Sequence, residues 1–164
     1  MIPNHFHFLG VVRIEEELDI AIAKIGTKSA IRFQEGKASY SEVILQQFSN
    51  FFNSYASANN VRRDRPGALL QKRFKRILLK NEDEILWMLH YIHQNPLHHH
   101  LVEDYLSWRY NSYKAYLSKS PTLVEREEAL QLFDPNDNAS ALKDFITFHE
   151  EQKDWDRIKG ICLE

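Results

Sequence analysis

The amino-acid sequence predicts an α+β fold, because strand-like stretches stand among stretches with helical periodicity. Residues 4–13 are largely apolar and are followed by charge, and residues 68–79 alternate basic and apolar side chains, as strands do. Residues 82–95 have the clearest helical period of the chain. The side chains predicted for the buried face of that helix are Ile85, Met88, Leu89 and Ile92.

Further helices are predicted before residue 60. Residues 15–25 favour a short helix that ends near Gly26, whereas residues 27–39 show no clear period and are predicted to be a loop. Ser41 is predicted to cap a helix that runs to about Asn59. The apolar stripe of that helix, interpreted as simple core, consists of Val43, Ile44, Phe48, Phe51, Phe52 and Tyr55.

The C-terminal part of the chain is predicted to be helical. Pro96 is expected to stop the helix before it, and a turn and a new helix are expected from about Asn111. Residues 123–133 and 139–151 have the pattern of two amphipathic helices. Acidic residues outnumber basic ones in this part, so we do not expect it to contact a phosphate backbone.

Composition limits the class of protein. A chain of 164 residues with 43% hydrophobic content fits one globular domain. Its one cysteine, Cys162, cannot form an internal disulfide, which suits a cytoplasmic protein and excludes a cysteine-based zinc cluster. No apolar run approaches the ~20 residues that span a bilayer, and no secretory signal is visible.

Basic residues are concentrated in residues 62–80, which hold eight arginines or lysines against one aspartate. The segment carries +7 and, because the whole chain carries -2, the other 145 residues carry -9. Such separation favours a polyanion site, and the alternative is a charged edge strand that resists aggregation. The residues predicted to bind nucleic acid are Arg62, Arg63, Arg65, Lys72, Arg73, Lys75 and Arg76.

Two pairs of residues carry candidate chemistry. In a strand, His5 and His7 point to the same face, which makes half of a metal site or, alternatively, two solvated histidines at a strand end. Tyr91 and Asn95 are one turn apart on the predicted helix and present a phenol and an amide oxygen together. Imidazoles and an amide oxygen can hold a divalent cation, and a phenol can attack a phosphate that the cation polarises.

These residues lie in motifs that follow one another as in a known family. The motifs are Pro3-Asn4-His5-Phe6-His7-Phe8-Leu9, Gly67-Ala68-Leu69-Leu70-Gln71-Lys72-Arg73-Phe74, Tyr91-Ile92-His93-Gln94-Asn95-Pro96, Leu101-Val102-Glu103 and Trp108-x-x-Asn-Ser-Tyr113. Over residues 1–117 the chain resembles the HUH (His-hydrophobic-His) single-tyrosine transposases. Within them it is similar to the REP-associated tyrosine transposases of the insertion-sequence transposase-like family.

The resemblance implies a fold, a reaction and a set of site residues. The fold would be a ferredoxin-like antiparallel sheet with helices packed on it. Tyr91 would be the catalytic nucleophile, and His5, His7 and Asn95 would hold Mg²⁺ or Mn²⁺. The reaction would cleave single-stranded or hairpin DNA, leaving a 5′-phosphotyrosine and a free 3′-hydroxyl. The protein would then be nucleoid-associated in a bacterial-type cytoplasm. The resemblance leaves open whether it forms a homodimer.

The chain also departs from that family. The family has a strand and a helix before the HUH strand, so residues 1–117 are expected to form a partial domain: either its sheet is truncated at the N-terminus or the true start lies upstream. Residues 118–164 are expected to be an acidic helical extension packed on it. The alternative function is a truncated or domesticated relative that binds structured nucleic acid without cutting it. A third interpretation is an interaction protein whose histidines are incidental.

Overall fold

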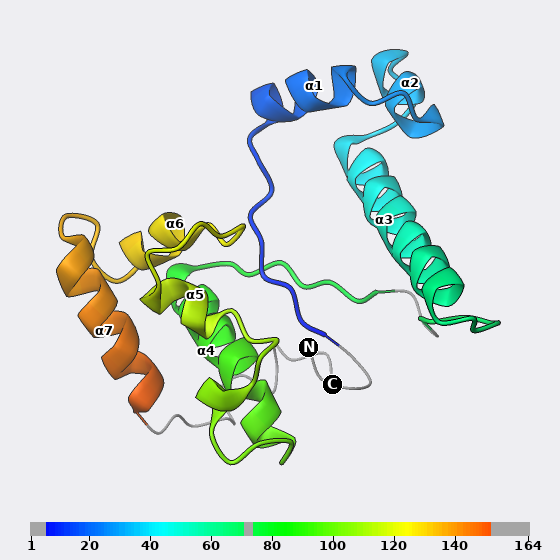
Figure 1. Cartoon of the computed structure of the whole chain (residues 1–164). Helices are drawn as coiled ribbons and strands as arrows, with labels where there is room; N and C mark the ends of the chain where they lie inside the picture. The colour runs from blue at the N-terminus through cyan, green and yellow to red at the C-terminus, as the bar shows by residue number, and fades with distance from the viewer. Residues whose placement is uncertain (1–5, 71–73, 152–164) are drawn as a thin grey trace. The chain divides into compact units, whose positions relative to one another are not determined.

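The computed structural model describes residues 6–70 and 74–151 of the chain (Figure 1). Helices hold 58% of the described residues and none of them is in a strand, so the predicted ferredoxin-like antiparallel sheet is wrong. The helices are α1 (Glu15–Ala23), α2 (Lys28–Gln34), α3 (Tyr40–Arg62), α4 (Glu82–His98), the 3-10 turn η1 (Tyr105–Ser107), α5 (Tyr113–Leu117), α6 (Arg126–Gln131) and α7 (Asn138–Glu150).

The two segments predicted to be strands have no regular structure where they are described. Residues 6–13 run as an extended segment before α1, and residues 74–79 do so before α4 (Figure 1). A strand persists only where a neighbouring strand satisfies its backbone N–H and C=O groups. The described chain brings no such neighbour to either segment. Apolar side chains therefore stay exposed along them, namely Phe8, Val11, Val12 and Leu78.

Residues 11–75 form one compact unit, in which α2 contacts both α1 and α3. Its core is small, with one buried side chain from each helix: Ile22, Ala30 and Val43. Half-buried apolar side chains surround these three. The hydroxyl of Thr27 also caps α2 by accepting a hydrogen bond from the N–H of Ala30. The apolar area enclosed by this unit is therefore modest, and helix caps contribute a larger share of its stability.

Two predictions for this unit are corrected. Residues 27–39 contain α2, and are not only a loop; seven residues are too few to show a helical period, and Gly36 ends the helix at φ +69°. The cap of α3 is Ser39 and not Ser41. The Ser39 hydroxyl accepts from the N–H of Glu42, whose carboxylate accepts from the N–H of Ser39, which is a capping box.

The aromatic side chains of α3 do not form the simple core that the sequence predicts. Phe48 and Phe52 pack against Phe74 with ring centroids 5.5 and 5.3 Å apart, and all three rings are only partly covered or exposed. Phe51 and Tyr55 are exposed. Within the described part of this unit there is too little chain to cover every aromatic ring of a 23-residue helix.

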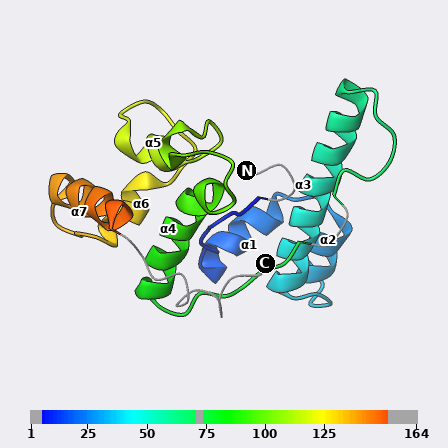
Figure 2. The same ribbon diagram turned by 90° about the horizontal axis from the view of Figure 1, so that it is seen from below.

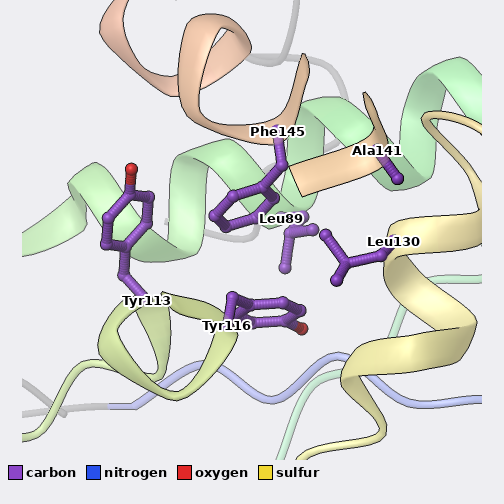
Figure 3. Packing of buried hydrophobic residues seen from close by; sticks show 6 residues of the cluster. All are labelled: Leu89, Tyr113, Tyr116, Leu130, Ala141 and Phe145. Atoms are coloured by element: carbon purple, nitrogen blue, oxygen red, sulfur yellow. The ribbon is translucent and has the colours of Figure 1, made fainter. Parts of the chain in front are cut away.

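The other unit consists of residues 6–10 and 76–151 in the described chain, with α5, α6 and α7 gathered around α4 (Figures 1 and 2). Its core is aromatic (Figure 3). Phe145 of α7 is completely buried, and its ring stacks on Tyr113 and Tyr116 of α5 at centroid distances of 5.2 and 4.8 Å. The other buried members of this core are Leu89, Leu130 and Ala141.

Helix α4 begins where the sequence predicts but continues past Pro96 to His98. A proline in the last turn removes one backbone hydrogen bond, and the turns on either side of it remain. The helix ends in a Schellman motif, in which the N–H groups of His100 and Leu101 donate to the carbonyls of Leu97 and Pro96 at 2.9 and 3.0 Å. His100 adopts φ +54°, the left-handed conformation that this motif requires.

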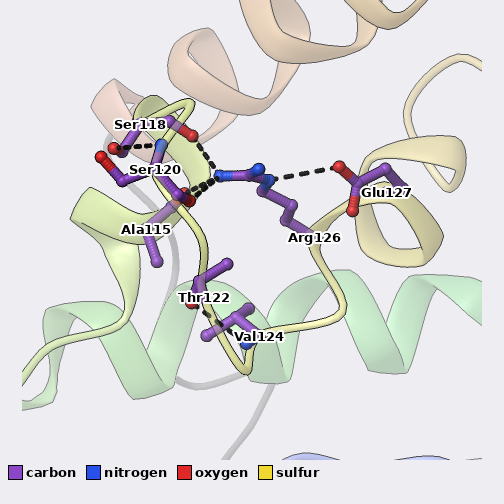
Figure 4. Close-up of polar contacts among 7 residues, drawn as sticks. All are labelled: Ala115, Ser118, Ser120, Thr122, Val124, Arg126 and Glu127. Atoms are coloured by element: carbon purple, nitrogen blue, oxygen red, sulfur yellow. Dashed lines mark hydrogen bonds and ion pairs between the residues drawn. The ribbon is translucent and has the colours of Figure 1, made fainter.

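Arg126 closes the loop between α5 and α6 (Figure 4). Its Nη1 donates to the carbonyl oxygens of Ala115, Ser118 and Ser120, and its Nε forms an ion pair with Glu127 at 3.2 Å. The last carbonyls of a helix have no partner inside the helix. The guanidinium therefore supplies donors that the end of α5 and the loop after it would otherwise take from water.

The remaining predicted helices are confirmed. Helices α1 and α6 are shorter than predicted, α5 begins at Tyr113, and α7 has the predicted length but begins and ends one residue earlier. The predicted domain boundary after residue 117 is not tested and stays a prediction. No helix in the described ranges combines the length and the apolar content needed to cross a membrane.

Candidate functional site

The structure brings together two residues that the sequence singles out far apart in the chain. The ring of His7, from the extended N-terminal segment, meets the ring of Tyr91 on α4 edge to face, with centroids 5.3 Å apart and planes at 73°. The residue predicted to be the nucleophile and one predicted metal ligand are therefore neighbours. They meet although no sheet lies beneath them in the described chain.

Asn95 lies one turn further along α4 than Tyr91, and it is buried. Of the predicted metal ligands, His7 and Asn95 are thus beside Tyr91, and His5 lies outside the described residues. An amide oxygen is a ligand that Mg²⁺ and Mn²⁺ accept, and an imidazole nitrogen is a common partner for Mn²⁺ and related ions. The chemistry of these two donors fits such a cation beside Tyr91. Within residues 6–70 and 74–151, however, no three His, Cys, Asp or Glu side chains form a metal-binding group.

The site is enclosed. The Tyr91 side chain is only 3% exposed, and its phenol oxygen and the Nε2 of His7 are both shielded from solvent. A phosphodiester can therefore reach the phenol only after the covering chain moves.

The predicted nucleic-acid-binding residues that are described are all exposed. Arg62, Arg63 and Arg65 lie at the C-terminal end of α3, where their charge also complements the helix dipole. None of these three arginines forms an ion pair with another residue in the described ranges. Lys75 and Arg76 lie in the extended segment before α4. The two that fall outside the described residues are Lys72 and Arg73.

Helix α4 also buries polar side chains that the sequence does not single out. His93 is completely enclosed, with its Nε2 2.9 Å from the Ser112 hydroxyl and its Nδ1 2.9 Å from the Nε2 of His149. The Nδ1 of His149 in turn lies 2.8 Å from the carbonyl oxygen of Phe145. We call Ser112, His93 and His149 the histidine chain.

Other polar contacts run parallel to the histidine chain. The Gln94 side chain donates to the carbonyl of His149 at 3.1 Å, and the Asn111 side chain donates to the carbonyl of His93 at 2.7 Å. The ring of His90 lies 5.3 Å from that of His149. Burial lowers the pKa of His93 well below its usual value, and the neighbouring His149 and His90 lower it further. Helix α4 is thus joined to α7 and to the start of α5 by buried polar groups.

A helical period could not reveal this face of α4. Apolar spacing assigns the core to Ile85, Met88, Leu89 and Ile92. Of these only Leu89 is buried, and the fully buried positions also include His90 and His93. The sequence signal for this buried polar face was the pair His90 and His93, three residues apart in a helix and followed directly by Gln94 and Asn95. Such a run of polar side chains is compatible with a solvated face or with a buried network, and only the partner helices decide between them.

Comparisons with family models, with curated proteins and with solved structures find no match to this chain.

Proposed function

We propose that this protein is a metal-dependent DNA strand transferase that acts through one tyrosine, as the resemblance of its ordered motifs suggests. The observation that supports the proposal most is the contact between His7 and Tyr91, whose rings lie 5.3 Å apart. His7 lies near the start of the described chain and Tyr91 lies on α4. The reaction requires both residues in one place.

Each residue then has a defined role. The Tyr91 phenol oxygen attacks a phosphorus atom of single-stranded DNA and forms the 5′-phosphotyrosine bond. The P–O3′ bond breaks, and the departing 3′ oxygen takes up the proton that the phenol loses. His7, Asn95 and His5 are the residues that would hold Mg²⁺ or Mn²⁺ at this place. The cation, when bound, makes the phosphate more electrophilic.

The basic residues at the end of α3 and before α4 are proposed to hold the DNA backbone. Arg62, Arg63 and Arg65 expose three guanidinium groups, which suit phosphate because they are planar and always charged. Contacts of this kind position a strand without reading its sequence.

Covalent adducts test the proposal directly. The full chain is incubated with Mn²⁺ and a pool of labelled single-stranded hairpins, and adducts are separated on a denaturing gel. Wild type is expected to form an adduct that Tyr91→Phe loses entirely, because the substitution keeps the ring and removes the attacking oxygen. Tyr110→Phe is the matched control, since Tyr110 is another tyrosine and its side chain is exposed. An adduct that persists in Tyr91→Phe assigns the nucleophile elsewhere and contradicts the proposal.

The burial of Tyr91 favours a second candidate, a protein that binds structured single strands without cutting them. A phenol that is 3% exposed is poorly placed to receive a phosphate, whereas the basic residues are open to solvent. Under this function the DNA binds, with a strong salt dependence, and no adduct forms with any hairpin.

Salt dependence of binding tests the DNA-binding part that both functions share. Replacing Arg62, Arg63 and Arg65 by alanine is expected to reduce the slope of log affinity against log salt by roughly 0.7 for each phosphate that the variant no longer neutralises. The matched control replaces three exposed lysines outside the segment, Lys114, Lys119 and Lys143. Equal slopes in both triple variants would mean that the basic segment is only a solvated surface.

A further inference from the structure

Helix α3 extends beyond the small core of its unit. The side chains that join it to α1 and α2 come from its first turns. The Tyr40 hydroxyl donates to the carboxylate of Asp19 at 2.8 Å. The Gln47 amide donates to the Thr27 hydroxyl at 3.2 Å, and Val43 lies in the core itself. After these turns the helix continues past both partners, so its C-terminal half depends on other contacts (Figure 1).

Two aromatic rings and an arginine lie along one stripe of this half. Phe51 is 62% exposed and Tyr55 is 48% exposed, and Arg62 is exposed as well. At 3.6 residues for each turn, Tyr55 and Arg62 lie within about 40° of Phe51 around the helix axis, and about 6 and 16 Å further along it. We call Phe51, Tyr55 and Arg62 the α3 stripe. Arg63 and Arg65 follow it directly, so the stripe leads from aromatic rings to a group of guanidiniums.

The ring of Phe51 is supported from one side. It meets the ring of Phe52 at a centroid distance of 5.4 Å and an angle of 64°. Phe52 packs in turn on Phe74 and Phe48, at 5.3 and 6.2 Å. The residue after Phe74 is Lys75, so one more basic residue adjoins this aromatic cluster in the chain. A ring that is already supported, and still largely open to solvent, loses little entropy when a flat partner stacks on it.

The helix around the stripe carries no charge before its arginines. Residues 43–61 include no aspartate, glutamate, lysine or arginine, and their polar side chains are asparagine, glutamine, serine and one tyrosine. The chain outside residues 62–80 carries -9, so this stretch without carboxylates differs from the rest. A carboxylate beside the stripe would repel a phosphate backbone. Both the missing carboxylates and the arginines therefore favour an anionic partner.

We propose that the α3 stripe is a surface on which unpaired bases of single-stranded DNA stack, while Arg62, Arg63 and Arg65 hold the adjoining phosphates. This inference names the ligand of the DNA-binding part of the proposed function, and it rests on that part. Exposed aromatic faces are what an unpaired base needs, and they accept any base because each has a flat π-face. Bases of a duplex stack on one another and reach such a ring only at the cost of unstacking, so the ligand is a single strand.

Other partners fit this surface less well. Helices that pair as a coiled coil carry charged residues on both sides of the seam, and residues 43–61 have none. A helix that lies on a membrane has a polar face rich in lysine and arginine, which these residues lack as well. Aromatic rings that lead to basic side chains are instead the combination by which proteins hold single strands.

A pair of labelled strands tests the inference on the full chain. One is a thymidine oligonucleotide, and the other is an abasic strand of the same length and charge. Both are followed by fluorescence anisotropy at the same salt concentration. Wild type is expected to bind the thymidine strand about fivefold or more tightly for each base that stacks, which is about 25-fold or more for two rings. Equal affinities would overturn the inference and leave the phosphate contacts of the proposed function in place.

A double variant assigns this preference to the stripe. Phe51→Ala combined with Tyr55→Ala should bind the thymidine strand about 25-fold or more weakly and the abasic strand as wild type does. The slope of log affinity against log salt should not change, because no phosphate contact is removed. Val61→Ala is the matched control, since Val61 is exposed on the same helix and lies outside the stripe, and it should change neither affinity. Equal weakening for both strands would mean that the rings support the helix and not the bases, and would overturn the inference.

Two single variants separate stacking from general apolar contact. Tyr55→Phe keeps the flat ring and should bind the thymidine strand as wild type does. Tyr55→Leu keeps an apolar side chain without the ring, and should weaken that binding about fivefold or more. Wild-type affinity in Tyr55→Leu would mean that apolar contact is sufficient, which contradicts stacking.

These results can be separated from those of the adduct assay. A wild type that prefers the thymidine strand and forms no adduct supports the stacking surface and contradicts strand transfer. A wild type that binds neither strand overturns the inference together with the DNA-binding part of the proposed function. Sedimentation supplies the last test: if the wild type is a dimer and the double variant a monomer, the stripe is an interface between two copies, and the inference is wrong.

Discussion

The two compact units of this chain differ in the interactions that stabilise each of them internally. Residues 11–75 enclose three small or medium apolar side chains and depend on helix caps, and their ion pairs, such as Arg13–Glu17, are exposed. The unit built on α4 encloses stacked aromatic rings and a hydrogen-bonded histidine chain. All eight histidines of the sequence lie outside residues 11–75.

This difference decides which conditions each unit tolerates. Exposed ion pairs contribute about 0–1 kcal/mol each and are screened by salt, so they add little to the first unit. The stability contributed by helix caps and a few buried methyl groups changes little with pH near neutrality. A buried polar chain is worth more when complete and costs more when one member changes. The α4 unit should therefore be the more stable at neutral pH and the more sensitive to acid and to core substitution.

The largest effect is expected in the aromatic core. Phe145→Ala removes a completely buried ring that stacks on two tyrosines, and should cost about 3–5 kcal/mol. Val43→Ala, the matched change in the other unit, removes two methyl groups and should cost about 2 kcal/mol. Hydrogen exchange measured helix by helix checks both. A Phe145→Ala variant that loses protection equally in α1–α3 would contradict the division into two units.

A smaller effect is expected at the cap of α3. Ser39→Ala breaks the capping box with Glu42 and should destabilise residues 11–75 by about 1 kcal/mol, measured as a shift of the urea midpoint for α3. Ser41→Ala is the matched control, since Ser41 is exposed inside the helix and its replacement should change stability by less than about 0.5 kcal/mol. If Ser41→Ala destabilised the unit more than Ser39→Ala did, the cap of α3 would be Ser41 and not Ser39.

The same pair of serines shows what local sequence can predict. Helix positions followed from apolar spacing and end signals, and five of the seven α-helices in the described chain, α1, α3, α4, α6 and α7, lie close to their predicted ranges. The choice of Ser39 over Ser41 was also available locally, because only Ser39 has a glutamate three residues later. Helix α2 was missed because seven residues give a period no room to repeat.

The strands failed for a different reason. Residues 6–13 have the composition of a strand, but strand formation depends on a partner elsewhere in the chain, and local pattern carries no information about that partner. The contact between His7 and Tyr91 is likewise a tertiary fact that spacing could not supply. The histidine chain was hidden because polar residues in a helix are assigned to the solvent face until the partner helices are known.

The smallest effect concerns two helix ends that share one geometry in the two units. His100 after α4 and Asp64 after α3 both take positive φ, at +54° and +46°, within Schellman motifs. A side chain with a Cβ is strained there, and a glycine is not, although glycine loses more entropy on folding. His100→Gly should therefore stabilise its unit by about 0.5–1 kcal/mol, read as a higher urea midpoint for α4. Asp64→Gly should gain less, because a short polar side chain tolerates this conformation better than an imidazole does.

Gly36→Ala, the opposite change at φ +69°, should cost about 1 kcal/mol in α2 and serves as the control. A loss of stability in His100→Gly would mean that the imidazole makes contacts worth more than the backbone strain, and would place it among the side chains that hold the end of α4.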